Sequence, residues 1–277
     1  MNNPSRKEMY NYYFEDPKNK KIVKTLNKAR LEYFYFNKGF DIKTGDYEVC
    51  NICILGGNSK LIRNQEEHRI GKFDMAFLPE NEEIKLIPNQ QEPFTNKICV
   101  VSSPIVGKIG KEMGEGFTIK HFSWEKFVPR GELGDNKKMT TYREVLTYYK
   151  NGYFMSGFTN IPKKSLEQGV VTSVNLEESK SGKIRIYPHI HSEFPEVYIF
   201  CISDKTKSVA VTQYLINSEG NSVCKDLIDG EGLFFEGFMG HMNFIKPTYK
   251  NLEYCMYMWI IPTFGKEKDI TPTTLLV

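Results

Sequence analysis

The chain has 277 residues, of which 40% are hydrophobic, so it can form a sizeable core and is long enough to predict two domains. Its 37 basic and 34 acidic residues nearly balance, which argues against a nucleic-acid partner. Residues 1 to 20 lack the apolar segment of a signal peptide, and no stretch approaches the roughly 18–20 apolar residues of a membrane span. We therefore expect a soluble, cytoplasmic protein without a membrane partner.

The first predicted element is a short helix over Pro17–Lys28, because Ile22, Val23 and Leu26 would share one side of it. From Leu31 onward, short apolar runs alternate with turn signals, a pattern typical of a β-sandwich or barrel. An aromatic content of 13% also favours strands. The strands predicted in the first half are Leu31–Phe36, Val49–Leu55, Lys60–Arg63, Met75–Leu78 and Ile98–Val101.

The second half repeats this pattern after a turn-rich segment, Gly131–Asn136, which we interpret as a boundary between domains 1–130 and 131–277. Each half contains a glycine-opened apolar strand before a tight turn, at Gly71–Pro79 and Gly232–Gly240. A histidine, His241, follows only the second turn, so we expect two related barrels with one functional site and a structural or assembly role for the first. The predicted strands are Gly152–Phe158, Gly169–Asn175, Lys183–His191, Glu196–Ile202, Ser208–Leu215, Leu233–Phe235 and Tyr254–Ile261.

The six cysteines are too few in a chain of this length to form a disulfide framework. Cys50 and Cys53 have the spacing of half a zinc site, but they lie within the predicted strand Tyr47–Leu55. Side chains three positions apart on a strand point to opposite faces, and no second cysteine pair exists. We therefore predict no metal at this pair.

The most informative stretch is Tyr187-Pro-His-Ile-His-Ser-Glu-Phe-Pro-Glu-Val-Tyr198. His189 and His191 are two positions apart, so on a strand their imidazoles project from the same face. Proline interrupts the ladder before Glu196, so the carboxylate at the start of the next strand can face the same interior. His241 follows the later glycine turn and can bring a third imidazole to this point.

Histidines and a carboxylate with an open coordination position suit a catalytic divalent cation. Histidine pairs also occur on ordinary strand surfaces, but three of the five histidines in this chain fall into the pattern. His68, which we place in a charged loop, and His121 are expected to be ordinary surface or packing residues. We predict one divalent ion per chain, zinc first and manganese, iron or nickel as alternatives, with the ligands His189, His191, Glu196 and His241.

At these residues the sequence resembles the cupin superfamily and, more closely, the bicupin uronate isomerases. The segment His189–Phe200 is similar to the metal segment of 5-dehydro-4-deoxy-D-glucuronate isomerase, and Leu133–Asn136 resembles the opening of its second barrel. Ile52–Pro88 resembles the first barrel of that enzyme and of 5-deoxy-glucuronate isomerase of inositol catabolism. The sequence departs from the family where proline and glycine usually precede the last histidine, because Glu236 and Phe238 stand there.

The resemblance implies an all-β fold of two cupin-type (jelly-roll) barrels in tandem, with few short helices. It also implies a homo-oligomer that interconverts an aldose and a ketose form of a small acidic sugar. For that reaction we predict Glu193 as the acid/base group, with a solvated turn residue as the alternative. Arg185 and Tyr187 share strand parity with the histidine pair and are predicted to bind substrate, the alternative for Arg185 being a surface position near the barrel rim. Asn243 shares parity with His241 and could orient it. A cupin oxygenase using iron and a non-catalytic sugar-binding protein remain the alternatives.

Overall fold

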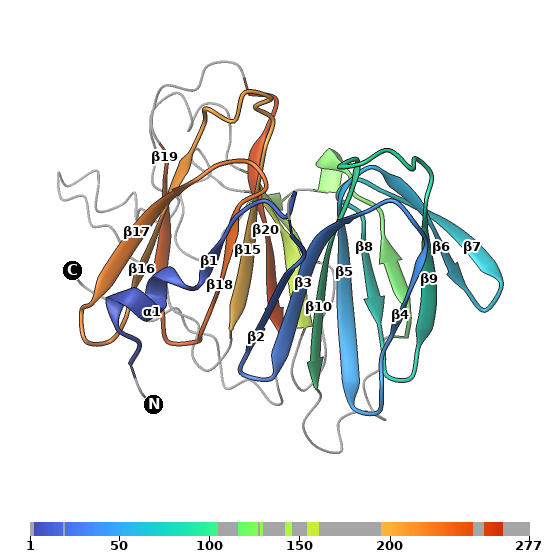
Figure 1. Cartoon of the computed structure of the whole chain (residues 1–277), viewed down its shortest axis with the longest axis horizontal. Coiled ribbons are helices and arrows are strands. Elements are labelled where there is room, and N and C mark those ends of the chain that lie inside the picture. Colours follow the sequence, from blue (N-terminus) through green and yellow to red (C-terminus); the bar gives the residue numbers. More distant parts are fainter. Residues whose placement is uncertain are drawn as a thin grey trace.

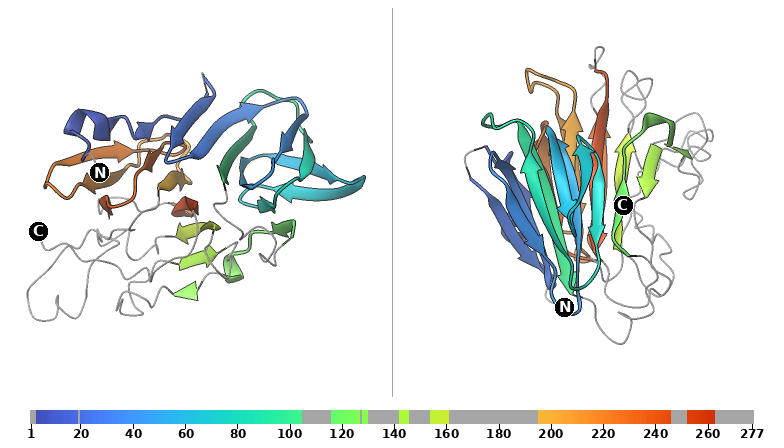
Figure 2. Two further views of the ribbon diagram at one scale, coloured as in Figure 1. Left: turned by 90° about the horizontal axis from the view of Figure 1, so that it is seen from below. Right: turned by 90° about the vertical axis from the view of Figure 1, so that its right-hand side faces the viewer.

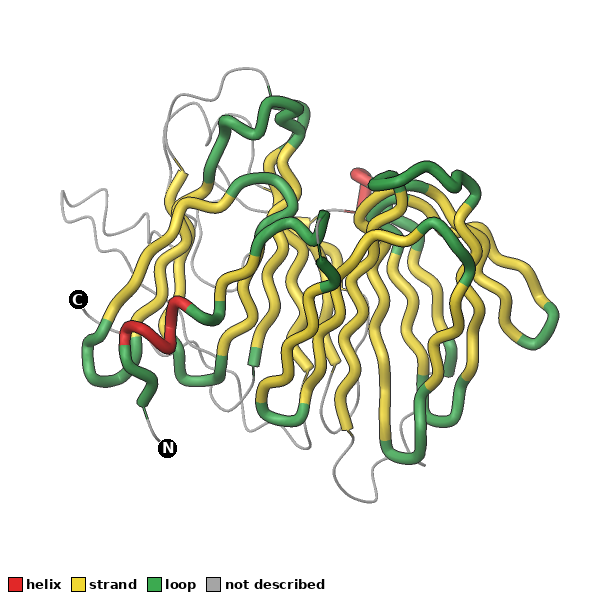
Figure 3. The backbone as a smooth tube through the Cα atoms, viewed as in Figure 1, coloured by secondary structure: helices red, strands yellow, loops and turns green. Residues whose placement is uncertain are grey.

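The computed structural model describes residues 3–18, 20–104, 116–126, 128–129, 142–145, 154–160, 195–245 and 252–262. Within these ranges the chain is almost entirely β-structure, with one α-helix, α1 (Arg6–Tyr10), and one 3-10 turn, η2 (Trp124–Lys126) (Figure 3). The strands form two groups that lie side by side, each with a large and a small antiparallel sheet (Figure 1). The described part of the chain contains no helix with the length and apolar character needed to cross a membrane.

The first barrel is built from residues 22–120. Its large sheet has the order β11-β8-β5-β10-β3-β2 and its small sheet the order β4-β9-β6-β7. The large sheet comprises β2 (Ile22–Leu26), β3 (Ala29–Phe36), β5 (Glu48–Gly56), β8 (Met75–Leu78), β10 (Asn96–Pro104) and β11 (Thr118–Lys120). The small sheet comprises β4 (Phe40–Lys43), β6 (Asn58–Arg63), β7 (Glu66–Gly71) and β9 (Glu83–Pro88).

The second barrel has a large sheet of order β1-β18-β15-β20-β14-β13-β12 and a small sheet of order β17-β16-β19. The large sheet comprises β1 (Tyr13–Phe14), β12 (Val128–Pro129), β13 (Tyr142–Val145), β14 (Phe154–Asn160), β15 (Glu196–Ile202), β18 (Gly232–Phe235) and β20 (Cys255–Pro262). The small sheet comprises β16 (Val211–Ile216), β17 (Ser222–Leu227) and β19 (Gly240–Ile245).

The two large sheets repeat one topology, as the sequence pattern predicted. The order β8-β5-β10-β3-β2 in the first sheet corresponds to β18-β15-β20-β14-β13 in the second. The connections from β8 to β9 and from β18 to β19 also match, because the third residue of each turn, Asn81 or Phe238, has a left-handed backbone with φ of 58° or 61°. The chain therefore consists of two barrels of the same design.

Three apolar clusters follow from the strict alternation of side chains along the strands. Even-numbered β15 residues such as Tyr198 and Phe200 belong to the cluster inside the second barrel. Odd-numbered ones such as Val197 and Ile199 belong to a cluster shared with the large sheet of the first barrel. A third cluster fills the first barrel. The two large sheets thus pack face to face between the two barrel interiors, as the layers in Figure 2 show.

The N-terminal segment joins the second barrel rather than the first. Helix α1 lies against β17, and β1 pairs with β18, where Phe14 is opposite Gly232. A Cβ atom at Gly232 would lie 2.7 Å from the Phe14 ring and would also meet the carbonyl oxygen of Tyr198, so this close approach requires glycine. The division at residues 1–130 and 131–277 stays a prediction, because residues 130–141 lie outside the described ranges.

The predicted helix over Pro17–Lys28 is wrong, because residues 22–26 form strand β2. Strands β2 and β3 pair antiparallel as a hairpin, with Leu26 opposite Ala29. Asn27 and Lys28 both have positive φ values, 46° and 69°, as a two-residue type I′ turn requires. Apolar residues at positions 22, 23 and 26 do not separate a helix from a strand, whereas the Asn27 turn signal favours the hairpin.

Candidate functional site

The predicted carboxylate ligand, Glu196, opens strand β15 directly after Pro195. Proline cannot extend a β-ladder through its nitrogen, so the strand begins at the next residue. Glu196 shares the parity of Tyr198 and Phe200 and therefore faces the interior of the second barrel. Its side chain is 3% exposed, which is unusual for a carboxylate and requires a charged or hydrogen-bonding partner.

The predicted histidine ligand, His241, reaches the same interior from the opposite sheet. It is the second residue of β19 and pairs with Leu215 of β16, which belongs to the apolar cluster of this barrel. The His241 side chain is 1% exposed, and its Nε2 atom lies 3.3 Å from Oε2 of Glu196. The sequence separates these two residues by 45 positions, and the closure of the barrel brings them together.

The hydrogen bond on the other ring nitrogen of His241 determines what Nε2 presents to Glu196. Nδ1 lies 3.0 Å from the carbonyl oxygen of Met239, and because a carbonyl only accepts, Nδ1 carries the proton. Nε2 can then contact the carboxylate in one of two ways. It donates a proton if the ring is an imidazolium, or its lone pair binds the same cation as the carboxylate. Histidine ligands of metals commonly donate their second N–H to a carbonyl in this way.

Aromatic rings and buried amides surround this pair. The ring centroid of His241 lies 5.5 Å from that of Tyr198 and 4.8 Å from that of Phe235, so apolar surface keeps bulk water away. Asn243 and Gln213 are opposite each other on β19 and β16, and both are buried. Their side-chain oxygens have no hydrogen-bond partner within the described residues, so they can accept from a bound hydroxyl group.

Gln213 was not predicted from the sequence. Its neighbours Val211 and Leu215 are buried and alternate with half-buried positions, so their parity places Gln213 in the barrel interior. An amide in an otherwise apolar alternation is the signal that could have identified it. Asn243 was predicted to orient His241, but the hydrogen bond on Nδ1 goes to Met239 instead.

The position of Glu196 in the first barrel is taken by a cysteine. Glu196 is opposite Phe235, the last residue of β18, and Cys50 is opposite Leu78, the last residue of the equivalent strand β8. Cys50 is completely buried, and burial raises the pKa of its thiol. It packs within the apolar cluster of the first barrel, and the carboxylates of Glu48 and Glu32 raise the pKa of the thiol further, so the surroundings do not favour a thiolate.

The other polar positions are also apolar in the first barrel. The turns of equal length before β9 and β19 make Ile84 equivalent to His241 and Leu86 equivalent to Asn243. Leu86 is opposite Leu61, just as Asn243 is opposite Gln213. Cys50, Ile84, Leu86 and Leu61 therefore stand in the first barrel where the second has Glu196, His241, Asn243 and Gln213.

Five predicted site residues lie outside the described residues: Arg185, Tyr187, His189, His191 and Glu193. Their roles stay predictions. Among the residues that the structure describes, no group of three or more histidine, cysteine or acidic side chains is arranged to hold a metal. Of the four predicted ligands, Glu196 and His241 are thus the two that the described ranges include, and these two are in contact.

The two remaining histidines lie away from this site. His68 is on strand β7, so its predicted loop location is wrong, and its ring lies 5.8 Å from that of Phe117. His121 has its Nδ1 atom 3.0 Å from Oδ2 of Asp74 and has a largely exposed side chain. Cys53, on β5, belongs to the cluster between the barrels, on the other face of the strand from Cys50, as expected from their spacing.

Comparison with known proteins identifies the fold. No protein-family model matches the chain. No curated protein matches it either. Among solved structures it is similar to an IolB-like protein from Salmonella typhimurium, with 10% identity, a TM-score of 0.57 and coverage of 95% of this chain and 94% of that one. AerE from Microcystis aeruginosa matches with 10% identity, a TM-score of 0.54 and coverage of 90% and 99%.

A variant of Bacillus subtilis oxalate decarboxylase, which has two cupin barrels, matches with 10% identity, a TM-score of 0.50 and coverage of 96% and 79%. The fold is a tandem cupin. This confirms the all-β fold of two jelly-roll barrels that the sequence predicted. At 10% identity these similarities establish the fold and leave the chemistry to be argued from the site itself.

Proposed function

We propose that this tandem cupin is a metal-dependent isomerase that interconverts the aldose and ketose forms of a deoxy-uronate sugar in its second barrel. The observation that carries the proposal is the buried contact between Glu196 and His241, at 3.3 Å, in that barrel. The first barrel has Cys50 and Ile84 at the equivalent positions, so a polar centre there is not a general requirement of the fold.

The residues present fit a divalent cation. A buried carboxylate beside a histidine whose Nδ1 is bound to a carbonyl is the donor chemistry that zinc, manganese and iron accept. We assign His189 and His191, which precede Glu196 by seven and five positions, as the remaining ligands. When bound, the metal would supply Lewis acidity to neighbouring substrate oxygens.

The protein's own residues supply positioning and proton transfer. Tyr198 and Phe235 exclude water around His241, and the amide oxygens of Asn243 and Gln213, which accept no hydrogen bond from the described residues, would accept from sugar hydroxyls. We assign Glu193 to move the proton between the adjacent carbons of the sugar. Arg185 would hold the substrate carboxylate in bidentate fashion, with Tyr187 beside it on the same strand face.

Two substrates are supported by different observations. The metal segment resembles that of 5-dehydro-4-deoxy-D-glucuronate isomerase, which makes this sugar the first candidate. The similarity in fold to an IolB-like protein, of the 5-deoxyglucuronate isomerase family, favours 5-deoxy-glucuronate as the second. Both are acidic sugars, so either is compatible with the predicted arginine.

The experiment is an assay of the purified protein with each sugar, before and after chelation and after restoring zinc, manganese or iron. We expect turnover of one sugar, loss after chelation and recovery with metal. Glu196→Gln should lower kcat by at least about 100-fold, because one ligand charge is lost, whereas Glu83→Gln, at an exposed ion pair of the first barrel, should retain activity. Failure to turn over either sugar with metal restored would refute the isomerase proposal, and oxygen consumption with iron would favour the oxygenase alternative.

The quaternary state belongs to the same proposal. Related bicupin isomerases imply a homo-oligomer, with a small acidic sugar as the ligand and no nucleic acid or membrane as a partner. Sedimentation velocity of the purified chain would test it, and a monomer at micromolar concentration would contradict the homo-oligomer.

A further inference from the structure

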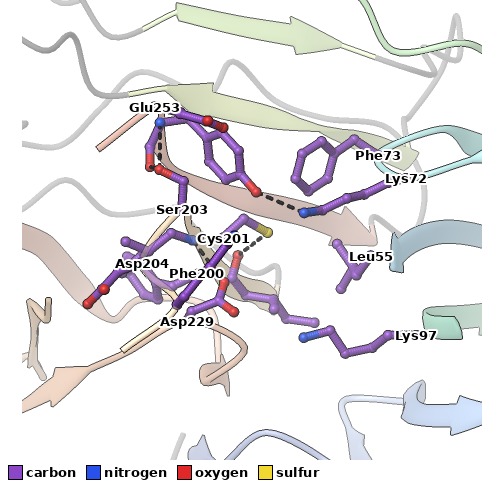
Figure 4. Close-up of a pocket in the computed structure, with 14 residues that line it drawn as sticks. Leu55, Lys72, Phe73, Lys97, Phe200, Cys201, Ser203, Asp204, Asp229 and Glu253 are labelled. Atoms are coloured by element: carbon purple, nitrogen blue, oxygen red, sulfur yellow. Dashed lines mark hydrogen bonds between the residues drawn. The ribbon is translucent and has the colours of Figure 1, made fainter. Parts of the chain in front are cut away.

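A cavity of about 430 Å³ lies where the two barrels meet (Figure 4). Its volume falls in the range of roughly 300–1,000 Å³ that is typical of small-molecule sites. The first barrel lines it from the β7–β8 turn and from β10, and the second barrel lines it from the end of β15 and the residues before β18 and β20. Glu196 and His241 are not among its lining residues, so this cavity is distinct from the candidate isomerase site.

The ammonium group of Lys97 is buried at this cavity and makes no hydrogen bond with the residues that the structure describes. Lys97 is 8% exposed, and its Nζ atom lies 3.6 Å from Oδ2 of Asp16. That oxygen already accepts hydrogen bonds from Lys207 at 3.0 Å and from the Tyr35 hydroxyl at 3.3 Å. Within the described part of the chain, Lys97 has only this shared ion pair and two aromatic rings, of Tyr35 and Tyr33, within 6 Å. A buried ammonium with unfilled donors is costly, so its position indicates a site for an anionic oxygen.

A second ammonium group enters the cavity from the β7–β8 turn. Lys72 donates a hydrogen bond of 2.8 Å to the Tyr254 hydroxyl and lies 4.8 Å above the Phe73 ring. Burial alone would lower the pKa of Lys72, but the hydrogen bond with Tyr254 keeps this pKa above its usual value. Lys72 therefore remains charged at neutral pH and keeps further N–H donors for a ligand.

Hydrogen-bond acceptors face the two lysines. Figure 4 shows Asp229 and Ser203 on the side of the cavity opposite Lys72 and Lys97. Asp229 accepts one hydrogen bond, at Oδ1, from the backbone nitrogen of Ile202, and its Oδ2 atom can accept another. Asp204, Glu253 and Lys205 also line the cavity, and Asp204 already accepts hydrogen bonds from Thr206 and Ser208. Lys72 and Lys97 on one wall and Asp229 on the other suit a ligand that carries both an anionic group and hydroxyl groups.

We propose that the cavity between the barrels binds a small polyhydroxylated anion. Lys97 and Lys72 hold its carboxylate or phosphate, and Asp229 accepts from its hydroxyl groups. The anionic oxygens give Lys97 the hydrogen bonds that the described residues do not provide. The same chemistry is offered by a sugar acid and by a sugar phosphate, so the experiment must separate the two.

The test is calorimetric titration of the full-length protein with D-gluconate, with D-glucose 6-phosphate and with uncharged D-glucose. We expect one or both anions to bind at submillimolar to millimolar concentration and glucose not to bind, and the tighter anion identifies the preferred group. Trp124, whose ring centroid lies 5.9 Å from that of Tyr254, should change its fluorescence on binding. Absence of binding by both anions to the wild-type protein would overturn the proposal.

Variants assign the binding to this cavity. Lys97→Met keeps an unbranched side chain that is one atom shorter, and it should weaken binding of the anion by at least about tenfold, because a buried charged partner is removed. Lys72→Met should weaken binding of the anion as well. If Lys97→Met does not fold, a loss of affinity of about tenfold in Lys72→Met assigns the binding to this cavity. Lys60→Met removes an equal charge at an exposed ion pair with Glu67 and should leave the affinity unchanged. Unchanged affinity in both cavity variants would refute the assignment.

The isomerase proposal and the proposal of an anion site in this cavity can be refuted independently. Glu196→Gln should abolish metal-dependent turnover and leave the gluconate or glucose 6-phosphate affinity intact, since Glu196 does not line the cavity. A Glu196→Gln protein that folds but no longer binds the anion would show that the ligand enters the second barrel and would contradict the cavity proposal.

Discussion

Replacing Glu196 by glutamine tests the contact at the centre of the second barrel. In the metal-free protein, Nδ1 of His241 is bound to Met239, so a proton on Nε2 makes an imidazolium–carboxylate pair with Glu196. A glutamine amide can instead donate to the lone pair of a neutral imidazole. One buried hydrogen bond then replaces the ion pair, and we expect metal-free Glu196→Gln to lose only about 1 kcal/mol of unfolding free energy.

Glu196→Ala should cost more, because alanine removes the carboxylate and supplies no polar group in its place. His241 is 1% exposed, so water cannot replace the carboxylate without opening the barrel. Breaking a buried charge pair from one side typically costs about 3–5 kcal/mol. The difference in unfolding free energy between Glu196→Gln and Glu196→Ala therefore measures how much a polar group at position 196 stabilises the protein.

Metal binding supplies the decisive part of this test. An ion that binds only the folded state at 1,000 times its dissociation constant stabilises it by about 4 kcal/mol. With a urea m-value of about 2–3 kcal/mol/M, the wild-type unfolding midpoint should rise by roughly 1–2 M when zinc is restored to the chelated protein. Glu196→Gln should lose most of this rise, and Glu83→Gln, whose side chain is exposed, should retain it. An equal zinc-induced rise in Glu196→Gln and wild type would refute the ligand assignment.

Three further predictions concern the framework around the site. Gly232→Ala should lower stability by about 1–3 kcal/mol in urea unfolding, because the added methyl group overpacks against Phe14, and an unchanged midpoint would contradict the strand pairing. Asn81→Phe should cost about 1 kcal/mol, because this exposed turn residue has φ of 58°, and a stability gain would contradict the left-handed turn. Burial raises the pKa of Asp16, but Lys97 and Lys207 hold it below its usual value. The stabilisation by ionised Asp16 is therefore present above about pH 4 and is lost as the pH falls through the lowered pKa of Asp16. Asp16→Asn should flatten the acid side of a profile of unfolding free energy against pH.

Much of the fold could be predicted because strand alternation and turn residues are local signals. The predicted strand over residues 196–202 coincides with β15, and the one at 75–78 coincides with β8. The error at residues 22–26 arose because three apolar positions fit both a helix and a strand, whereas the Asn27–Lys28 turn settles the structure. The joining of β1 to the second barrel has no local signal, since it depends on a pairing about 220 positions away.

The site was predictable only as far as side-chain chemistry shows in the sequence. Glutamate and histidine are conspicuous in a β-rich chain, and the structure brings Glu196 and His241 into contact. Gln213 was missed because a single amide in a strand carries no signature until its parity is known. The cavity between the barrels was also invisible, because Lys72 and Lys97 are ordinary lysines in the sequence, and the packing of the two barrels brings them to one cavity and buries Lys97.

X-ray absorption spectroscopy of the purified protein, combined with elemental analysis, tests the central claim most directly. We predict about one metal ion per chain, coordinated only by nitrogen and oxygen at about 2.0–2.2 Å if it is zinc, with the scattering signature of several imidazoles. His241→Ala should lose most of the ion. A sulfur shell, or full metal content in His241→Ala, would contradict a centre built on Glu196 and His241.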